Sequence, residues 1–220
     1  RMSKVTGLSD VGIKQIAYSE ALNITIITYE NCNIDLLKNN KIINISDIKR
    51  KEIIGLKSIN NITVESGIAY LSTTFGLVLV DLEKEEIKDT YRVGEEGNFA
   101  LINGCAFLGD SLVVATNDGL YFADINSQFL SDFNNWESWG NSYGNYDNII
   151  SISGGFYIDD DTALISIAYN NNTLIRTKID RVAVNIYNLS GPYTELIHEK
   201  FESIQYAWID NESIIWVADT

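Results

Sequence analysis

The chain alternates short apolar runs with polar turns, and this pattern predicts β-strands almost everywhere. Two segments, Gly67–Ile87 ("GIAYLSTTFGLVLVDLEKEEI") and Gly109–Asn126 ("GDSLVVATNDGLYFADIN"), each read as two strands joined by a tight turn. They align through Thr73 and Thr116, which are 43 residues apart. Helical periodicity is weak throughout, so the sequence predicts a repeated β-unit.

A first strand with a shared pattern precedes each of these hairpins, and the same pattern opens the chain: "IKQIAY" at 13–18, "INNITV" at 59–64 and "INGCAF" at 102–107. Polar turns follow the first strands near residues 21, 67, 110, 160 and 211, at spacings of 43 to 51 residues. Such spacings are typical of propeller blades, each a four-stranded antiparallel sheet.

We therefore expect the all-β class, a β-propeller of four-stranded antiparallel blades with about four and a half blades present. The expected organisation is a single partial propeller domain over 1–220, with approximate blades 5–48, 49–93, 94–140, 141–190 and an incomplete 191–220. Such a ring is incomplete, so we expect either a fragment of a longer chain or a partner that completes it.

The strands differ in how their apolar residues are spaced. The run "LVLVDL" at 77–82 is apolar at successive positions, which predicts a strand covered on both faces. The next run, "IKDTYRV" at 87–93, alternates, which predicts an outer strand with Ile87 and Tyr91 on one face and Thr90 on the other. The stretch 132–148 replaces a clean outer strand, and 188–193 interrupts the next one.

Glycines follow the polar turn at the same place in both hairpins, Gly76 and Gly119. Glycine tolerates positive φ without steric cost, so these residues predict turn chemistry inside a blade and no ligand loop.

The net negative charge of the chain limits the classes of partner that it can bind. Asp and Glu number 30 against 16 Lys and Arg, for a formal net charge of −14. Such a chain repels a polyphosphate backbone, so we expect no nucleic-acid partner, and anionic membrane surfaces are disfavoured for the same reason. The longest apolar runs are far shorter than a bilayer span, so the chain is expected to be soluble and not membrane-spanning.

Residues with potential chemistry are few and isolated. The sole histidine, His198, has no nucleophile-elbow pattern near it, and Cys32 and Cys105 lack zinc spacing and are not placed for a disulfide. Cys105 aligns with Ile16 and Ile62, which predicts a small buried residue. The triplet Asp159–Asp161 lies in a recurring polar turn and lacks the pattern of a calcium loop. We expect no catalytic residues, no metal and no cofactor.

An aromatic segment is the strongest ligand-binding candidate. Trp136, Trp139, Tyr143 and Tyr146 lie among Gly, Asn and Ser, a composition that resembles sugar-binding and protein-binding surfaces. The alternative, which we favour, is that one or two of these rings cap the propeller's own core.

The blades resemble the two-component-regulator propeller repeat family, in "TGLSDVGIKQIAYS", "LSTTFGLVLVDL", "VATNDGLYFAD" and "WVADT". The first hundred residues are more similar still to the N-terminal propeller of PorZ-like proteins of the Bacteroidetes type IX secretion system. That likeness rests on an ordered series: "IAYS", "NIDLL", "INISDI", "INNI", "AYLSTTFGLVLVDL" and "EIKDTYRVG". It implies a protein exported to the cell surface or periplasm that acts in an attachment complex, with no catalytic residues carried over.

Two functions follow as hypotheses. The first is a non-enzymatic exported propeller, a scaffold or ligand-binding module of a PorZ-like secretion and attachment complex. Its expected partners are other surface or secretion-complex proteins and a glycan or lipopolysaccharide, and self-association could complete the open propeller. The alternative is the periplasmic glycan-sensing propeller of a hybrid two-component histidine kinase. An enzyme with scattered carboxylates is a third alternative.

Overall fold

The computed structural model describes residues 7–94, 100–108, 110–116 and 119–138, together with the backbone of seven strand segments: 149–157, 162–169, 173–180, 186–188, 195–196, 204–209 and 215–219. The chain forms two compact units, Arg1–Arg92 and Val93–Thr220. The predicted division into blades at fixed boundaries stays a prediction.

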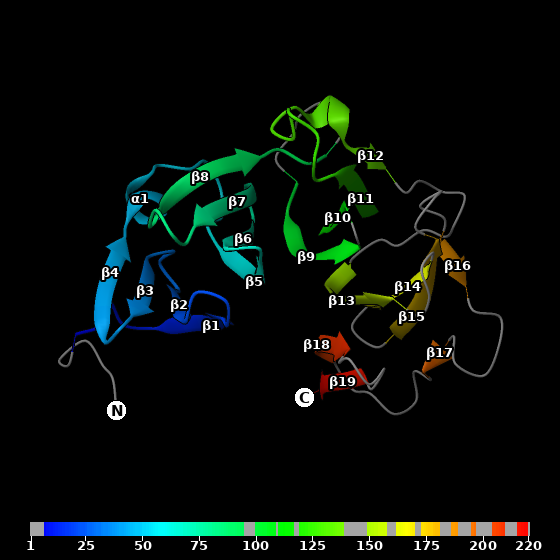
Figure 1. The fold of residues 1–220 in the computed structure, drawn as a ribbon, viewed down its shortest axis with the longest axis horizontal. Coiled ribbons are helices and arrows are strands. Elements are labelled where there is room, and N and C mark those ends of the chain that lie inside the picture. The colour runs from blue at the N-terminus through cyan, green and yellow to red at the C-terminus, as the bar shows by residue number, and fades with distance from the viewer. Residues whose placement is uncertain are drawn as a thin grey trace. The chain divides into compact units, whose positions relative to one another are not determined.

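The first unit contains two four-stranded antiparallel sheets whose strand order follows the chain (Figure 1). One sheet is made of β1 (Ile13–Ser19), β2 (Ile24–Tyr29), β3 (Ile34–Lys38) and β4 (Lys41–Ile45). The short helix α1 (Asp47–Arg50) follows. The other sheet is made of β5 (Ile59–Glu65), β6 (Ile68–Thr73), β7 (Gly76–Asp81) and β8 (Glu86–Tyr91).

The second unit continues the same plan. Its first sheet comprises β9 (Ile102–Leu108), β10 (Ser111–Thr116), β11 (Gly119–Asp124) and β12 (Glu137–Ser138), with the 3₁₀ turn η3 (Phe133–Asn135) before β12. The next comprises β13 (Ile149–Tyr157), β14 (Thr162–Tyr169), β15 (Thr173–Asp180), β16 (Ile186–Asn188) and β17 (Glu195–Leu196). The last described pair is β18 (Ile204–Ile209) with β19 (Ile215–Asp219).

The first strands of successive sheets are neighbours within each unit. β1 lies beside β5 in the first unit, and β13 lies beside both β9 and β18 in the second. Meandering four-stranded sheets that meet along their first strands are the blades of a β-propeller. The predicted all-β propeller fold is confirmed.

A one-residue β-bulge marks the same place in each described first strand. The pairing register with the second strand shifts directly after the first residue of the strand, where one residue is inserted: Lys14, Asn60, Asn103, Ile150 or Gln205. A bulge reverses the alternation of faces beyond it. Ile13 and Ile16 therefore share a face although they are three residues apart, and the aligned residues of β5, Ile59 and Ile62, do the same.

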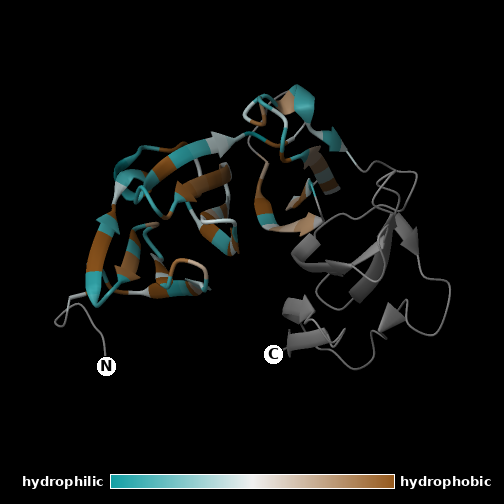
Figure 2. Ribbon diagram, viewed as in Figure 1, coloured by the Kyte–Doolittle hydropathy of each residue, from teal (hydrophilic) through white to brown (hydrophobic). Residues whose placement is uncertain are grey.

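The core of the first unit lies between its two sheets, where aliphatic side chains of both are buried. In Figure 2 the strands β2, β3 and β7 carry much of this apolar surface in brown. Leu77, Val78, Leu79 and Val80 of β7 are each at most 1% exposed, so both faces of this strand are covered. The prediction drawn from its unbroken apolar run is confirmed.

The predicted alternation of the outer strand β8 was wrong. The register shifts between Leu79 and Val80, so that Val80 pairs with Ile87 while Val78 pairs with Thr90. Partners that lie directly opposite share a face, and Val78 and Val80 point the same way. Ile87 and Thr90 therefore share a face, and Tyr91 lies on the other, because the bulge reverses the alternation.

The hairpin turns show why the two segments align through Thr73 and Thr116. Gly76 has φ +115° and Gly119 has φ +127°, values that only glycine adopts without strain. The Thr73 hydroxyl donates to the carbonyl of Gly76 at 2.6 Å, and the Thr116 hydroxyl donates to that of Gly119 at 2.9 Å. Both turns thus use the same threonine-to-glycine hydrogen bond.

The irregular outer strands occur where the sequence predicted them. β12 is only two residues long, and it pairs with Tyr121 and Phe122 of β11. In the following sheet, β16 and β17 both pair with β15 on either side of the predicted interruption.

Candidate functional site

The aromatic segment falls partly within the described structure. Trp136 follows η3, whereas Trp139, Tyr143 and Tyr146 lie outside the described residues, so the predicted set stays a prediction. Trp136 is 7% exposed, and its indole N–H donates to the Leu130 carbonyl at 2.9 Å. A ring held in this way packs on protein, as in the alternative that a ring of this segment caps the core.

The segment before Trp136 is fixed by local polar contacts. The carboxylate of Asp132 accepts the backbone N–H of Asn134 at 3.0 Å, which caps η3. The Asn135 amide donates to the carbonyl of Phe129 at 2.8 Å, while the Phe129 side chain is 66% exposed. The chain is therefore ordered where the aromatic segment begins.

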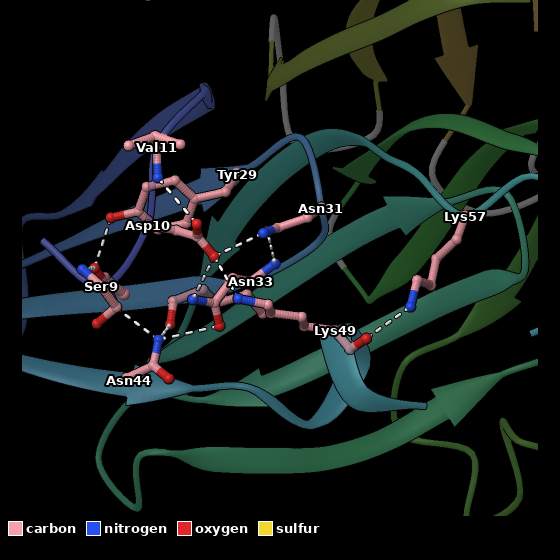
Figure 3. Close-up of polar contacts among 11 residues, drawn as sticks. Ser9, Asp10, Val11, Tyr29, Asn31, Asn33, Asn44, Lys49 and Lys57 are labelled. Carbon is pink, nitrogen blue, oxygen red and sulfur yellow. Dashed lines mark hydrogen bonds and ion pairs between the residues drawn. The ribbon is translucent and has the colours of Figure 1, made fainter. Parts of the chain in front are cut away.

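The most extensive polar network among the described residues lies in the first unit, and Figure 3 shows most of it. We call it the Asp10 cluster; its members are Ser9, Asp10, Tyr29, Asn31, Asn33, Asp35, Asn44 and Lys49. They come from the segment before β1, the end of β2, the β2–β3 turn, β3, β4 and α1. The cluster thus joins segments that are far apart in sequence.

Asp10 is 7% exposed and is surrounded by donors. Its Oδ2 accepts from the Lys49 ammonium at 2.6 Å and from the side-chain amides of Asn31 at 2.6 Å and Asn33 at 3.4 Å. Its Oδ1 accepts the backbone N–H of Val11 at 3.1 Å. The ion pair ties the segment before β1 to α1.

Asp35 is fully buried in β3. Its Oδ2 accepts the Ser9 backbone N–H at 2.8 Å and the Tyr29 hydroxyl at 2.6 Å, and its Oδ1 accepts the Asn44 amide at 2.8 Å. A buried carboxylate is tolerated only when hydrogen bonds replace the water that it has lost. Three donors from three segments meet that need here.

The electrostatics of the cluster keep both carboxylates ionised. The hydrogen bond from Lys49, followed by that from Asn31, holds the pKa of Asp10 well below its usual range. Burial would raise the pKa of Asp35, but hydrogen bonds led by Ser9 outweigh it and lower the pKa. Burial and the Asp35 charge raise the pKa of Tyr29, which therefore stays protonated. A general acid at neutral pH needs a raised carboxyl pKa, so neither carboxylate suits that role, and their hydrogen bonds tie the segment before β1 to β3 and α1.

Sequence reasoning missed the Asp10 cluster. A local signal existed: "LSDV" at 8–11 recurs as "ISDI" at 45–48, and "NCN" at 31–33 places two amides around one residue. Cys32 at that turn has φ +61°, and the Asn31 side chain accepts the Asn33 backbone N–H at 3.1 Å. Spacing alone could not reveal that these segments meet.

The other residues with potential chemistry are the two cysteines, the histidine and the aspartate triplet. Cys32 and Cys105 are both free and buried, at 0% and 1% exposure, which confirms the predicted burial of Cys105. Burial raises the pKa of the Cys32 thiol, which makes it a poor nucleophile. His198 and the Asp159–Asp161 triplet lie outside the described residues.

The described part of the chain offers neither a metal site nor a membrane-spanning helix. Within it, no set of three or more His, Cys, Asp or Glu side chains is arranged to hold a metal ion. None of its helices has the length and apolar character needed to cross a membrane.

Solved structures with the same fold include surface and extracellular proteins. PorZ, an essential surface component of the type IX secretion system of Porphyromonas gingivalis, is 21% identical, with a TM-score of 0.63 over 99% of this chain and 31% of its own. The extracellular domain of a hybrid two-component system of B. thetaiotaomicron is 12% identical, with a TM-score of 0.63 over 100% of this chain and 29% of its own. This chain thus spans less than a third of either relative, and identities this low show the fold alone.

A match in sequence, unlike the shared fold, identifies the family of this chain. No curated protein sequence matches the chain. Residues 1–137 match the family described as the TSS9, PorZ, N-terminal beta-propeller domain. The match covers more than half of the 220 residues, including both sheets of the first unit and, except for Ser138, the first sheet of the second. The chain belongs to the family of PorZ N-terminal β-propeller domains.

Proposed function

We propose that this chain is part of an exported, non-enzymatic β-propeller that serves as a scaffold or ligand-binding module of a PorZ-like type IX secretion complex at the cell surface. The family match over residues 1–137 carries the proposal. The described carboxylates with shifted pKa values, Asp10, Asp35 and Asp81, all have lowered pKa values, which disfavours them as general acids at neutral pH.

Deletion of the complete gene in the source organism tests this function. We expect proteins secreted by the type IX system to lose their attachment to the cell surface, as measured by immunoblots of washed cells and of culture medium. An epitope-tagged copy is expected in the cell-envelope fraction and accessible to added protease on intact cells. Tagged protein found only in the cytoplasm would contradict the proposal.

The fold shared with an extracellular two-component domain favours one alternative, a glycan-sensing propeller of a hybrid histidine kinase. The two functions differ in what deletion changes: a sensor alters transcription in response to a glycan, whereas a secretion component alters surface attachment without one. RNA levels measured beside the attachment assay separate them.

We further propose that Trp139, Tyr143 and Tyr146 form the ligand-contacting part of the aromatic segment, while Trp136 supports it from the core. Flat rings among small polar residues favour sugar faces, which supports a glycan or lipopolysaccharide ligand. Titration calorimetry with surface glycans of the source organism is expected to show heat with the wild type and none with the W139A/Y143A variant. Equal binding by both proteins would reject this site.

A further inference from the structure

The connection between α1 and β5 places two aliphatic side chains in solvent. Ile54 is 105% exposed and Leu56 is 74% exposed, the highest values among the large hydrophobic residues of the described chain. Gly55 lies between them with φ +94°, and nothing lies within 4 Å of the position that a Cβ would take there. The turn therefore projects from the unit with an aliphatic residue on each side of a glycine.

The base of this loop, residues 51–58, is firmly attached. The Lys57 ammonium donates to the carbonyls of Ile48, Lys49 and Lys51 at 3.2, 2.8 and 3.1 Å. Ile48 is buried in the core and Ile53 packs against it. At the other end, the Thr74 hydroxyl donates to the carbonyl of Leu56 and accepts the Ser58 backbone N–H. The exposed side chains thus stand on an ordered base.

Order in the free protein favours binding, because a preorganised loop loses little conformational entropy when it docks. Aliphatic side chains held in water on such a base become more stable when a partner covers them, because their apolar surface leaves water. The loop therefore has the properties of a pair of interface anchors.

The charge around the loop is opposite to that of the whole chain. Residues 49–57 contain four of the sixteen basic residues, with Glu52 as the one acid, whereas the chain carries −14. Lys49 and Lys57 are engaged by Asp10 and by main-chain carbonyls, whereas Arg50, which forms an exposed 3.5 Å pair with Asp47, and Lys51 are exposed. A surface that complements the loop is apolar at its centre and acidic at its rim.

We propose that the loop of residues 51–58 is a docking surface for a partner protein that offers an apolar pocket bordered by acidic side chains. A lipid surface fits less well, because even one fatty-acyl chain binds a bilayer only marginally and two branched side chains bury less. The proposal rests on the proposed function in one respect, that the partner belongs to the same surface complex.

The test uses the complete protein expressed from its own locus with an affinity tag. Wild type is expected to run in a larger complex when envelope extracts are separated by size under native conditions, and I54S/L56S is expected to run at the size of the free protein. Loss of one buried anchor weakens a complex by about tenfold or more. The swap I54L/L56I keeps both apolar surfaces and is expected to stay in the complex.

A second control is F129S, which removes an aromatic side chain that is 66% exposed in the other unit. It is expected to stay in the complex, so the effect of I54S/L56S is not one of lost surface hydrophobicity. Circular dichroism of each purified variant checks that it folds; the exposed positions make loss of fold unexpected.

The remaining outcomes of these experiments would overturn the docking proposal, assign the loop to lipid or reject the proposed function. The docking proposal is overturned if I54S/L56S keeps the larger size, or if the wild type itself runs free. Sedimentation of the wild type, but not of I54S/L56S, with vesicles of equal parts phosphatidylglycerol and phosphatidylcholine would assign the loop to lipid. If gene deletion leaves surface attachment intact while the size shift occurs, the proposed function fails and the docking surface stands.

Discussion

Asp10 and Asp47 are the same type of residue in two different environments. Asp10 is buried, and it accepts the Lys49 ammonium at 2.6 Å together with two side-chain amides. Asp47 forms a 3.5 Å pair with Arg50, and both side chains are mostly exposed. Buried charge-assisted hydrogen bonds contribute far more to stability than an exposed ion pair does. The two aspartates therefore make a matched pair for mutation.

We expect Asp10→Asn to lower the free energy of unfolding by about 2 kcal/mol at neutral pH, because it leaves the Lys49 ammonium without its carboxylate. Asp47→Asn is expected to cause no measurable change. Urea unfolding followed by circular dichroism gives both values. Equal losses in the two variants would mean that the Asp10 cluster does not anchor the segment before β1.

The lowered pKa values of Asp10 and Asp35 fix the sign of a pH dependence. A carboxyl whose pKa is lower in the folded state adds stability above the ordinary value of about 4, and this is lost as the pH falls through the folded value. We expect the gap between wild type and Asp10→Asn to be full at pH 7 and to shrink below about pH 4. Urea unfolding at a series of pH values measures it; a constant gap would contradict the assignment.

At the scale of elements, the hairpin turns of the two units offer a natural comparison. A Cβ on Gly76 would lie 2.7 Å from the Tyr91 carbonyl oxygen, whereas a Cβ on Gly119 would meet nothing within 4 Å. Both residues have positive φ, so both substitutions strain the backbone. Only the first also forces two strands apart.

We therefore expect Gly76→Ala to destabilise the protein more than Gly119→Ala does. Backbone strain costs about 1–3 kcal/mol in both variants, and the clash with Tyr91 adds to it in the first. The midpoint of thermal unfolding, followed by circular dichroism, ranks them. Equal losses in the two variants would show that movement of β8 relieves the clash, and a larger loss in Gly119→Ala would contradict the ranking.

The sequence predicted strands and turns better than it predicted faces. Repeated threonines, glycines and apolar runs led to the sheets, because each depends on residues close together in the chain. The faces of β8 were wrong because the bulge beside Lys88 leaves no mark in the alternation of apolar residues. The Asp10 cluster was missed because Asp10 and Lys49 meet only after folding. The exposed loop at Ile54 was missed because the type of an apolar residue does not reveal whether its side chain is buried or exposed.

At the scale of the whole molecule, the net charge of −14 opposes extended contact with a polyanion. The basic run at residues 49–57 is local, and salt screens charges beyond about 8 Å under physiological conditions. Nucleic acid presents a continuous line of phosphates, so the acids around the run oppose any extended contact.

We expect the purified chain to leave the mobility of duplex DNA and of single-stranded RNA unchanged in native gels at about 0.15 M salt. A lysine-rich protein of similar size serves as the positive control. A shift that weakens steeply as salt rises would show that the basic run binds phosphates despite the field of the chain.

The bulge after the first residue of β1, β5 and β9 also has a consequence for how such a protein evolves. A duplicated segment that carries its own bulge brings its own register, so the copied hairpin needs no adjustment elsewhere to keep its apolar row on one face. The segment that can be exchanged between copies then extends from one bulge to the next. Recombination at aligned positions would yield foldable chimaeras, whereas a crossover that loses or doubles the bulge would turn the apolar row of the strand to its other face.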